Sequence, residues 1–159
     1  MSFIITGLPR SRTAWFAKFF TALGHPCHHE LLAHSNSEDE FIIDLYLGGN
    51  ADCGMAYYGE IALPTVIVHR PIIEVIDSLK QLYNKDMTKM LYALQKKLRT
   101  FKGLHVNFYD LDRQLESIVY YCTNTYPDSK IVEEFKQMTI EAEQCTPTSW
   151  AMQLLKENT

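Results

Sequence analysis

The amino-acid sequence predicts a three-layer α/β/α domain around a mainly parallel central sheet. Three observations carry this prediction. Short apolar segments alternate with longer amphipathic ones along the whole chain, and residues 64–69 form a short β-branched run that is typical of a buried strand. The N-terminus reads as an apolar strand, a polar loop and a helix. With 159 residues and no repeat or linker, the chain is expected to form one domain over residues 1–159.

The elements follow in chain order from local signals. The predicted strands are residues 3–6, 26–29, 64–69 and 104–108. The predicted helices are residues 13–23, 37–47, 71–83, 87–101, 112–125, 129–142 and 148–156. Gly24 ends the first helix, Ser37 and Glu40 form a capping box for the second, and Pro71 opens the third. Residues 48–54 are rich in glycine, asparagine and aspartate, which predicts a turn-forming stretch.

Composition limits the classes of function. The net charge of −4 argues against broad binding to nucleic acid or to anionic membranes, so any anion site must be local. The four cysteines form no C-x-x-C pair, which predicts neither a structural zinc site nor a redox dithiol. The N-terminus lacks the pattern of a secretion signal, and no apolar run approaches the about 20 residues of a membrane span. We therefore expect a soluble, cytoplasmic protein.

The loop that follows the first strand indicates an anion site. A helix N-terminus offers unpaired N–H groups and the positive end of its dipole. A nucleoside-triphosphatase loop reads G-x-x-x-x-G-K-[ST], and counting from Gly7 places Arg12 at the second glycine, Thr13 at the lysine and Ala14 at the hydroxyl that holds magnesium. The loop is therefore expected to bind an anionic group that reacts without a metal, and sulfuryl transfer fits this description.

The predicted topology brings distant residues to one edge. Right-handed crossovers gather the carboxyl ends of parallel strands, and ligands bind there. We expect Arg10, Glu30, Arg70 and the chain near Tyr109 to meet at this edge. Arg70 ends the clearest strand, and Ser78 follows eight residues later, about two helical turns along. Taken alone, these two could equally be a surface arginine and a serine on a helix face.

Together, the two segments resemble the sulfotransferases that use 3′-phosphoadenosine 5′-phosphosulfate (PAPS), in particular compact P-loop-like members with a G-x-P-R-S-R/G-T start. The resemblance covers residues 2–30 and 64–83. It implies a P-loop-like fold in which the first loop binds the 5′-phosphosulfate and Arg70 with Ser78 binds the 3′-phosphate; Glu74 stands at the family's acidic position between them. The loop residues concerned are Pro9, Arg10, Ser11, Arg12, Thr13, Ala14 and Trp15. The chain departs from the family in having Arg12 where a glycine is usual and in lacking a C-terminal R-K-G element.

Sulfuryl transfer needs a cation near the leaving phosphate and a base for the acceptor's proton. The resemblance assigns the first role to Arg10. For the base, Glu30 is the first candidate and His29 the second, because compact family members carry a glutamate near this point. A plainer interpretation is that the histidines here only surround a loop. No metal is expected, since acidic or cysteine partners do not stand at ligand spacing. Asp52 is expected to face the acceptor or to cap a helix.

The predicted function is thus transfer of a sulfuryl group from PAPS to a hydroxyl or amine of a small-molecule or saccharide acceptor. Two alternatives stay open at this point. One is a divergent nucleotide kinase or phosphatase, which the missing Walker lysine and hydroxyl disfavour. The other is a non-catalytic module that binds a nucleotide or another anion, because a fold alone does not fix a function.

Overall fold

The computed structural model describes residues 1–141 and 145–158. It contains an all-parallel, five-stranded sheet in the order β2-β3-β1-β4-β5. The strands are β1 (Ile4–Gly7), β2 (Cys27–His29), β3 (Gly49–Ala51), β4 (Thr65–His69) and β5 (Leu104–Asn107). The three-layer α/β/α class with a parallel sheet, predicted from the alternating pattern, is confirmed.

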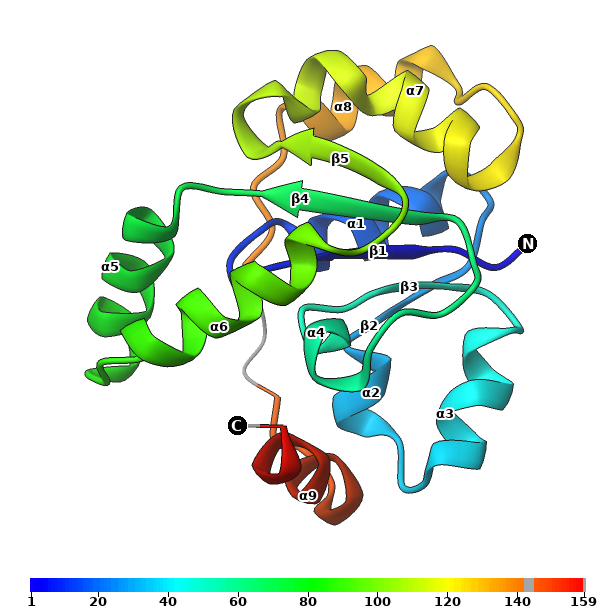
Figure 1. The fold of residues 1–159 in the computed structure, drawn as a ribbon. Helices are drawn as coiled ribbons and strands as arrows, with labels where there is room; N and C mark the ends of the chain where they lie inside the picture. The colour runs from blue at the N-terminus through cyan, green and yellow to red at the C-terminus, as the bar shows by residue number, and fades with distance from the viewer. Residues whose placement is uncertain (142–144, 159) are drawn as a thin grey trace.

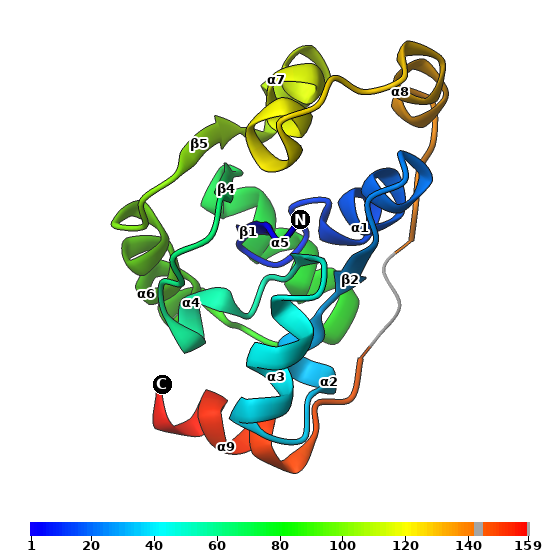
Figure 2. The same ribbon diagram turned by 90° about the vertical axis from the view of Figure 1, so that its right-hand side faces the viewer.

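Helices cover both faces of the sheet, as Figures 1 and 2 show. One face carries α1 (Thr13–Ala22), α7 (Leu111–Thr123) and α8 (Ser129–Lys136). The helices of the other face are α2 (Leu31–His34), α3 (Glu38–Leu45), α4 (Met55–Tyr58), α5 (Ile72–Tyr83), α6 (Thr88–Arg99) and α9 (Ser149–Glu157). A short 3₁₀ turn, η1 (Phe108–Asp110), joins β5 to α7.

Side chains that point alternately to the two faces of the central strands explain why helices cover both faces of the sheet. Phe3 and Ile5 pack into the cluster beneath α1, α7 and α8, whereas Ile4 packs into the cluster on the opposite face. In β4, Val66 and Ile67 divide between the same two clusters. Successive side chains of a strand point to opposite faces, so a strand that is apolar at every position must be covered on both sides.

The strand β3 and the short helices α2 and α4 were not predicted, and one helix ends well before its predicted end. Residues 48–54 contain the strand β3 and lead into α4, and α2 follows directly on β2. Asn50 and Asp52 hold α2 in place, because their side chains accept hydrogen bonds from the first amides of this helix. The helix predicted over residues 129–142 ends at Lys136; residue 142 lies outside the described residues.

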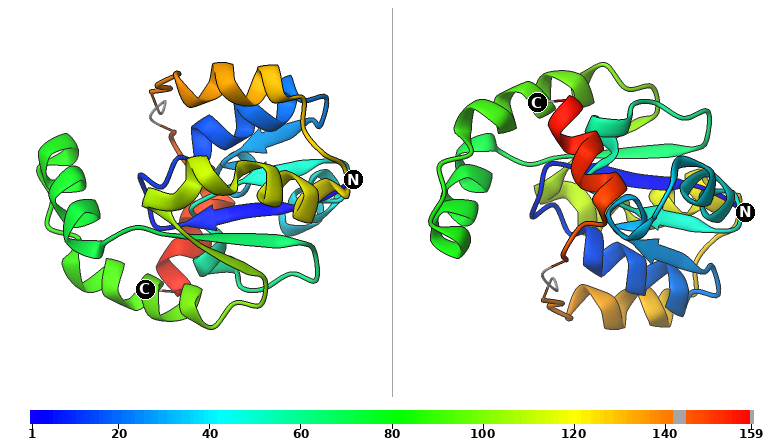
Figure 3. Two further views of the ribbon diagram at one scale, coloured as in Figure 1. Left: turned by 90° about the horizontal axis from the view of Figure 1, so that it is seen from above. Right: turned by 90° about the horizontal axis from the view of Figure 1, so that it is seen from below.

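The parallel arrangement places every strand's carboxyl end on one side of the molecule, where the β1–α1 loop also lies (Figure 1). Helix α5 stands beyond this edge, as both views of Figure 3 show. Over residues 1–141 and 145–158, no helix has the length and apolar character that crossing a bilayer requires.

Candidate functional site

A cavity of about 390 Å³ opens at the carboxyl edge of the sheet. Four separate parts of the chain form it: the loop between β1 and α1, the end of β4, the turn from β5 into α7, and the end of α8 with the segment after it. The lining residues are Arg10, Arg12, Thr13, Ala14, Trp15, Arg70, Phe108, Asp112, Lys136, Met138, Thr139 and Ile140. Its volume lies within the range of small-ligand pockets, about 300–1,000 Å³.

The loop between β1 and α1 has an unusual backbone. Arg10 and Arg12 have φ angles of 69° and 67°, in the left-handed region that glycine adopts without cost. At Gly7, a Cβ atom would lie 2.7 Å from the carbonyl oxygen of Val68, so this glycine lets β1 and β4 approach closely. Helix α1 then begins at Thr13 without a side-chain cap on its free amides. Uncapped N–H groups at the start of a helix favour an anion.

Ser11 adds an unpartnered polar group to the loop. Its side chain is only 1% exposed, and its hydroxyl has no hydrogen-bond partner among the described residues. A buried hydroxyl without a partner costs about 1–3 kcal/mol in protein mutational data, and such groups are scarce in native folds. A ligand oxygen in the loop would relieve this cost.

Arg12 is fixed over one side of the cavity by two contacts. Its guanidinium lies 4.0 Å from the centre of the Trp15 ring and forms an ion pair of 3.1 Å with Asp112. Trp15 is itself held, because its indole N–H donates to the carbonyl of Phe135 on α8. Arg12 therefore adopts a backbone conformation that is typical of glycine and directs a cation to the cavity.

Arg70 joins the end of β4 to the loop. One of its terminal nitrogens donates a hydrogen bond of 2.7 Å to the carbonyl of Arg10, and its guanidinium lies 4.6 Å from the centre of the Phe108 ring. Glu74, one helical turn later, lies 3.7 Å from the other terminal nitrogen. The Nε atom is buried and unpartnered within the described part of the chain. Arg70 is thus held in place while its Nε–H group stays without a partner in the described part of the chain.

Charge is concentrated in this cavity. Among the described residues of the lining, four side chains are cationic, namely Arg10, Arg12, Arg70 and Lys136, and one, Asp112, is acidic. The whole chain nevertheless carries a net charge of −4. Cations gathered in a concave surface raise the local concentration of anions, so the cavity favours an anionic ligand.

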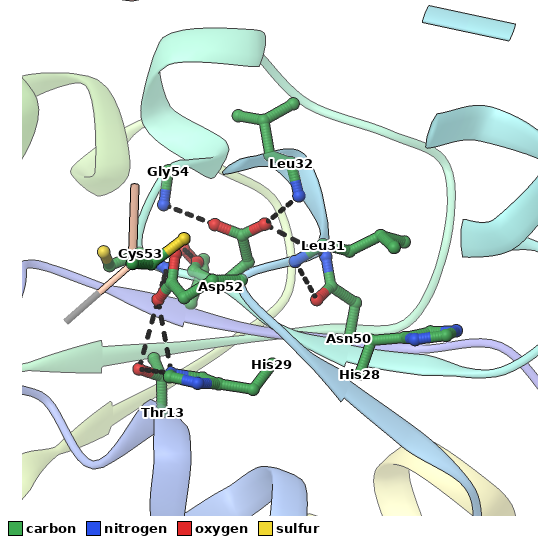
Figure 4. A network of polar contacts seen from close by, with 12 residues as sticks. Thr13, His28, His29, Leu31, Leu32, Asn50, Asp52, Cys53 and Gly54 are labelled. Atoms are coloured by element: carbon green, nitrogen blue, oxygen red, sulfur yellow. Dashed lines mark hydrogen bonds and ion pairs between the residues drawn. The ribbon is translucent and has the colours of Figure 1, made fainter. Parts of the chain in front are cut away.

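A second cluster lies at the ends of β2 and β3, and Thr13 connects it to the cavity (Figure 4). The Thr13 hydroxyl lies 3.4 Å from Oε1 of Glu30, to which it donates, and 3.3 Å from Nε2 of His29. Glu30 also accepts from the backbone amide of Cys53 at 3.0 Å. Neither Glu30 nor His29 lines the cavity. Thr13 therefore stands between the cavity and the two groups predicted to act as the base.

Asp52 lies fully buried beneath this cluster. Its carboxylate accepts hydrogen bonds from the backbone amides of Leu32 and Gly54, at 2.9 and 2.6 Å, and from the side-chain amide of Asn50. Asp52 was expected to face an acceptor or to cap a helix; the structure places it where it caps α2 and orders the turn before α4.

The surroundings of Glu30 make its carboxylate a stronger base than that of an exposed glutamate. Burial raises the pKa of Glu30 well above its usual range, and the nearby Asp52 carboxylate raises it further. Its side chain is 14% exposed. Its φ angle of 55° is a third left-handed conformation at this edge of the sheet. A carboxyl group with a raised pKa suits proton transfer near neutral pH.

The structure brings together part of the predicted set. Arg10, Arg12, Thr13, Ala14, Trp15 and Arg70 line one cavity, whereas Pro9, Ser11, His29, Glu30, Asp52 and Ser78 do not. Ser78 lies half-buried on α5. Sequence reasoning missed Phe108, Asp112, Lys136 and the segment after α8; these residues carry no motif and reach the cavity only through the packing of α7 and α8. Among the described residues, no group of three histidine, cysteine or acidic side chains is placed to hold a metal ion.

Comparisons with protein-family models, with curated proteins and with solved structures find no match to this chain.

Proposed function

We propose that this protein is a sulfotransferase that moves a sulfuryl group from PAPS to a hydroxyl or amine of a small-molecule or saccharide acceptor. One observation carries the proposal: the arginines of the β1–α1 loop and the arginine that ends β4 line the same cavity and are joined by a hydrogen bond from Arg70 to Arg10. The resemblance of these two segments to PAPS-binding elements rests on residues 60 positions apart. Their convergence supports a donor held at both of its phosphates.

The unpartnered atoms of the site suit such a donor. The Ser11 hydroxyl and the Nε of Arg70 are donors, and the phosphate oxygens of a nucleotide are acceptors. Arg10 is exposed, and among the described residues its guanidinium has no hydrogen-bond or ion-pair partner, so it is free to meet charge on the leaving phosphate. Lys136 supplies a cation from the C-terminal third of the chain, which lacks the R-K-G element of larger sulfotransferases.

Thermal unfolding with different nucleotides tests the proposal. The protein is heated with 3′-phosphoadenosine 5′-phosphate, the product form of the donor, and in parallel with ATP and magnesium. A ligand at 100 times its Kd adds about 2.7 kcal/mol to the free energy of unfolding, or roughly 5–10 °C in Tm for a domain of this size. We expect this increase with the 3′-phosphorylated nucleotide and a much smaller one with ATP. Equal increases would contradict a PAPS site, and a preference for ATP with magnesium would favour the kinase or phosphatase alternative.

Substitution of Arg70 sharpens this test. Arg70→Ala should weaken 3′-phosphoadenosine 5′-phosphate about tenfold or more, because a charge-assisted hydrogen bond contributes about 1.5–3 kcal/mol. Adenosine 5′-phosphosulfate, which has no 3′-phosphate, should lose much less affinity. Arg99→Ala is the matched control, since Arg99 is an exposed arginine on α6 that does not line the cavity. Equal losses for the two nucleotides would show that Arg70 does not bind the 3′-phosphate.

A further inference from the structure

We infer that the hydroxyl of Thr13 is the group that takes the acceptor's proton, and that it passes this charge to the buried Glu30–His29 pair. This inference rests on the proposed function and assigns a proton path within it. Thr13 is then a catalytic residue that touches the reacting group, and Glu30 acts through it.

The two groups predicted to act as the base are separate from the cavity. Thr13 lines the cavity, whereas Glu30 and His29 do not. The Thr13 oxygen nevertheless lies within 3.4 Å of a carboxylate oxygen of Glu30 and 3.3 Å from a ring nitrogen of His29. Thr13 is thus a single side chain that reaches both the cavity and this pair.

A threonine hydroxyl has the bonding capacity that the role requires. It carries one O–H donor and two acceptor positions. While it donates its own proton to Glu30, it can accept a hydrogen bond from an acceptor O–H in the cavity. The contacts with Glu30 and His29 hold the oxygen in this position.

Glu30 is fixed as the end of this path. The amide of Cys53 donates to the same oxygen, Oε1, that faces Thr13, and this bond holds the carboxylate in place. Burial and the neighbouring Asp52 raise the pKa of Glu30 well above its usual range, so a proton that arrives there is retained. His29, at 3.6 Å from the same oxygen, completes the pair.

The transfer step balances as follows. The acceptor oxygen forms a bond to sulfur, and the bond between sulfur and the bridging oxygen breaks. The leaving 3′-phosphoadenosine 5′-phosphate keeps that electron pair, next to Arg10. The acceptor's proton moves to Thr13 Oγ1 as the Thr13 proton moves to Glu30 Oε1. Glu30 begins this step as a carboxylate and ends as a carboxylic acid, and Thr13 is a neutral hydroxyl before and after it.

Thr13→Val tests the path because valine keeps the branched shape and removes the hydroxyl. We expect sulfuryl transfer to slow by about 10²-fold or more, the usual contribution of a positioned proton acceptor. The Kd for 3′-phosphoadenosine 5′-phosphate should change less than about twofold. This result would distinguish a role in proton transfer from a role in binding the donor. Thr13→Ser should restore most of the rate. Thr21→Val is the matched control and should keep the wild-type rate, since Thr21 is an exposed threonine in the last turn of the same helix and does not line the cavity.

The double variant Thr13→Val/Glu30→Gln shows whether the two residues act as one unit. In a shared path it should be no slower than the slower single variant, because either change already breaks the path. If the two losses multiply, or if Thr13→Val transfers at the wild-type rate, the proposed path is wrong. A large loss of nucleotide affinity in Thr13→Val would likewise overturn it, since Thr13 would then act by binding the donor.

A measurement without any donor keeps this test apart from the proposed function. NMR of the free protein reports the Glu30 carboxyl ¹³C and His29 imidazole ¹⁵N shifts. Both should move in Thr13→Val and stay close to wild type in Thr13→Ser; unchanged shifts in Thr13→Val would remove the structural basis of the path. Failure of the wild-type protein to prefer the 3′-phosphorylated nucleotide would instead contradict the proposed function, and with it a path that serves sulfuryl transfer.

Discussion

At the scale of single residues, Arg12 combines an unfavourable backbone with a useful side chain. A left-handed conformation costs a residue other than glycine roughly 1–2 kcal/mol, and Arg12 adopts it at the start of α1. The same residue stacks on Trp15 and pairs with Asp112 at the wall of the cavity. The unfavourable backbone conformation of Arg12 therefore lies where its cationic side chain faces the candidate ligand site. Clustering of such conformations at Arg10, Arg12 and Glu30 is typical of functional sites.

The pairing of Arg12 with Asp112 gives a prediction about affinity. Asp112→Asn removes the acidic group that lines the cavity among the described residues and leaves the Arg12 charge for the ligand. We expect 3′-phosphoadenosine 5′-phosphate to bind about three- to fivefold more tightly, equivalent to about 0.6–1 kcal/mol for a partly exposed pair. Isothermal calorimetry at low salt measures this change, which should shrink at high ionic strength.

A matched substitution separates this local effect from net charge. Asp110→Asn changes the chain's charge by the same amount, but Asp110 pairs with Arg113 outside the cavity lining. It should leave the affinity within about twofold of wild type. An unchanged or weaker affinity in Asp112→Asn would mean that Asp112 positions Arg12 more than it competes with the ligand.

At the scale of elements, local sequence determined most of the sheet but not β3. Residues 64–69 predict a strand because residues 65–68 are all β-branched, whereas Gly49, Asn50 and Ala51 have the composition of a turn. Their strand forms because β1 and β2 pair with it from either side and the Phe3 ring covers Gly49. Contacts between distant residues therefore decide this element, and no window of sequence contains them.

This account of β3 predicts that Gly49 cannot accept a side chain. A Cβ atom at Gly49 would overlap the ring of Phe3. Gly49→Ala should lower the free energy of unfolding by about 1–3 kcal/mol, the usual cost of overpacking a core, as measured by urea denaturation. Phe3→Leu in the same chain should recover part of the loss. If the two effects simply add, the ring is not what excludes the methyl group.

The residues of the candidate site likewise form two groups, those that local sequence predicted and those that depend on contacts between distant parts of the chain. The β1–α1 loop and Arg70 were predicted because they have recognisable local patterns at the ends of strands. Asp112 and Lys136 were not, since an acid in the first turn of a helix and a lysine in the last turn are ordinary placements. Their side chains reach the cavity because α7 and α8 pack beside α1. Ser78, which the spacing linked to Arg70, lies on a helix that stands beyond the sheet edge (Figure 1).

At the scale of the whole molecule, parallel topology lets an acidic chain build a cationic cavity. Each crossover returns the chain to the same edge, so loops from residues 10 to 140 meet there although they are separate in sequence. Outside the cavity lining, acidic residues outnumber basic ones, so the cations of the cavity are a local feature of the chain. Association with an anionic ligand should therefore depend on this edge alone.

The free energy of unfolding of the whole domain should also depend on the protonation of the buried Glu30. Its pKa in the folded protein lies above its unfolded value, so the folded state binds more protons and stability falls as the pH rises from about 4.3 through the folded pKa. Glu30→Gln mimics the protonated form and should therefore raise Tm at pH 7–8, by roughly 2–4 °C for each kcal/mol relieved. The gain should vanish below about pH 4, where wild-type Glu30 is protonated in both states.

Glu134→Gln, at an exposed glutamate of α8, is the control and should show no such pH dependence. A Glu30→Gln protein that is less stable than wild type at pH 8 would mean that the charged carboxylate contributes more through its Cys53 and Thr13 hydrogen bonds than burial removes.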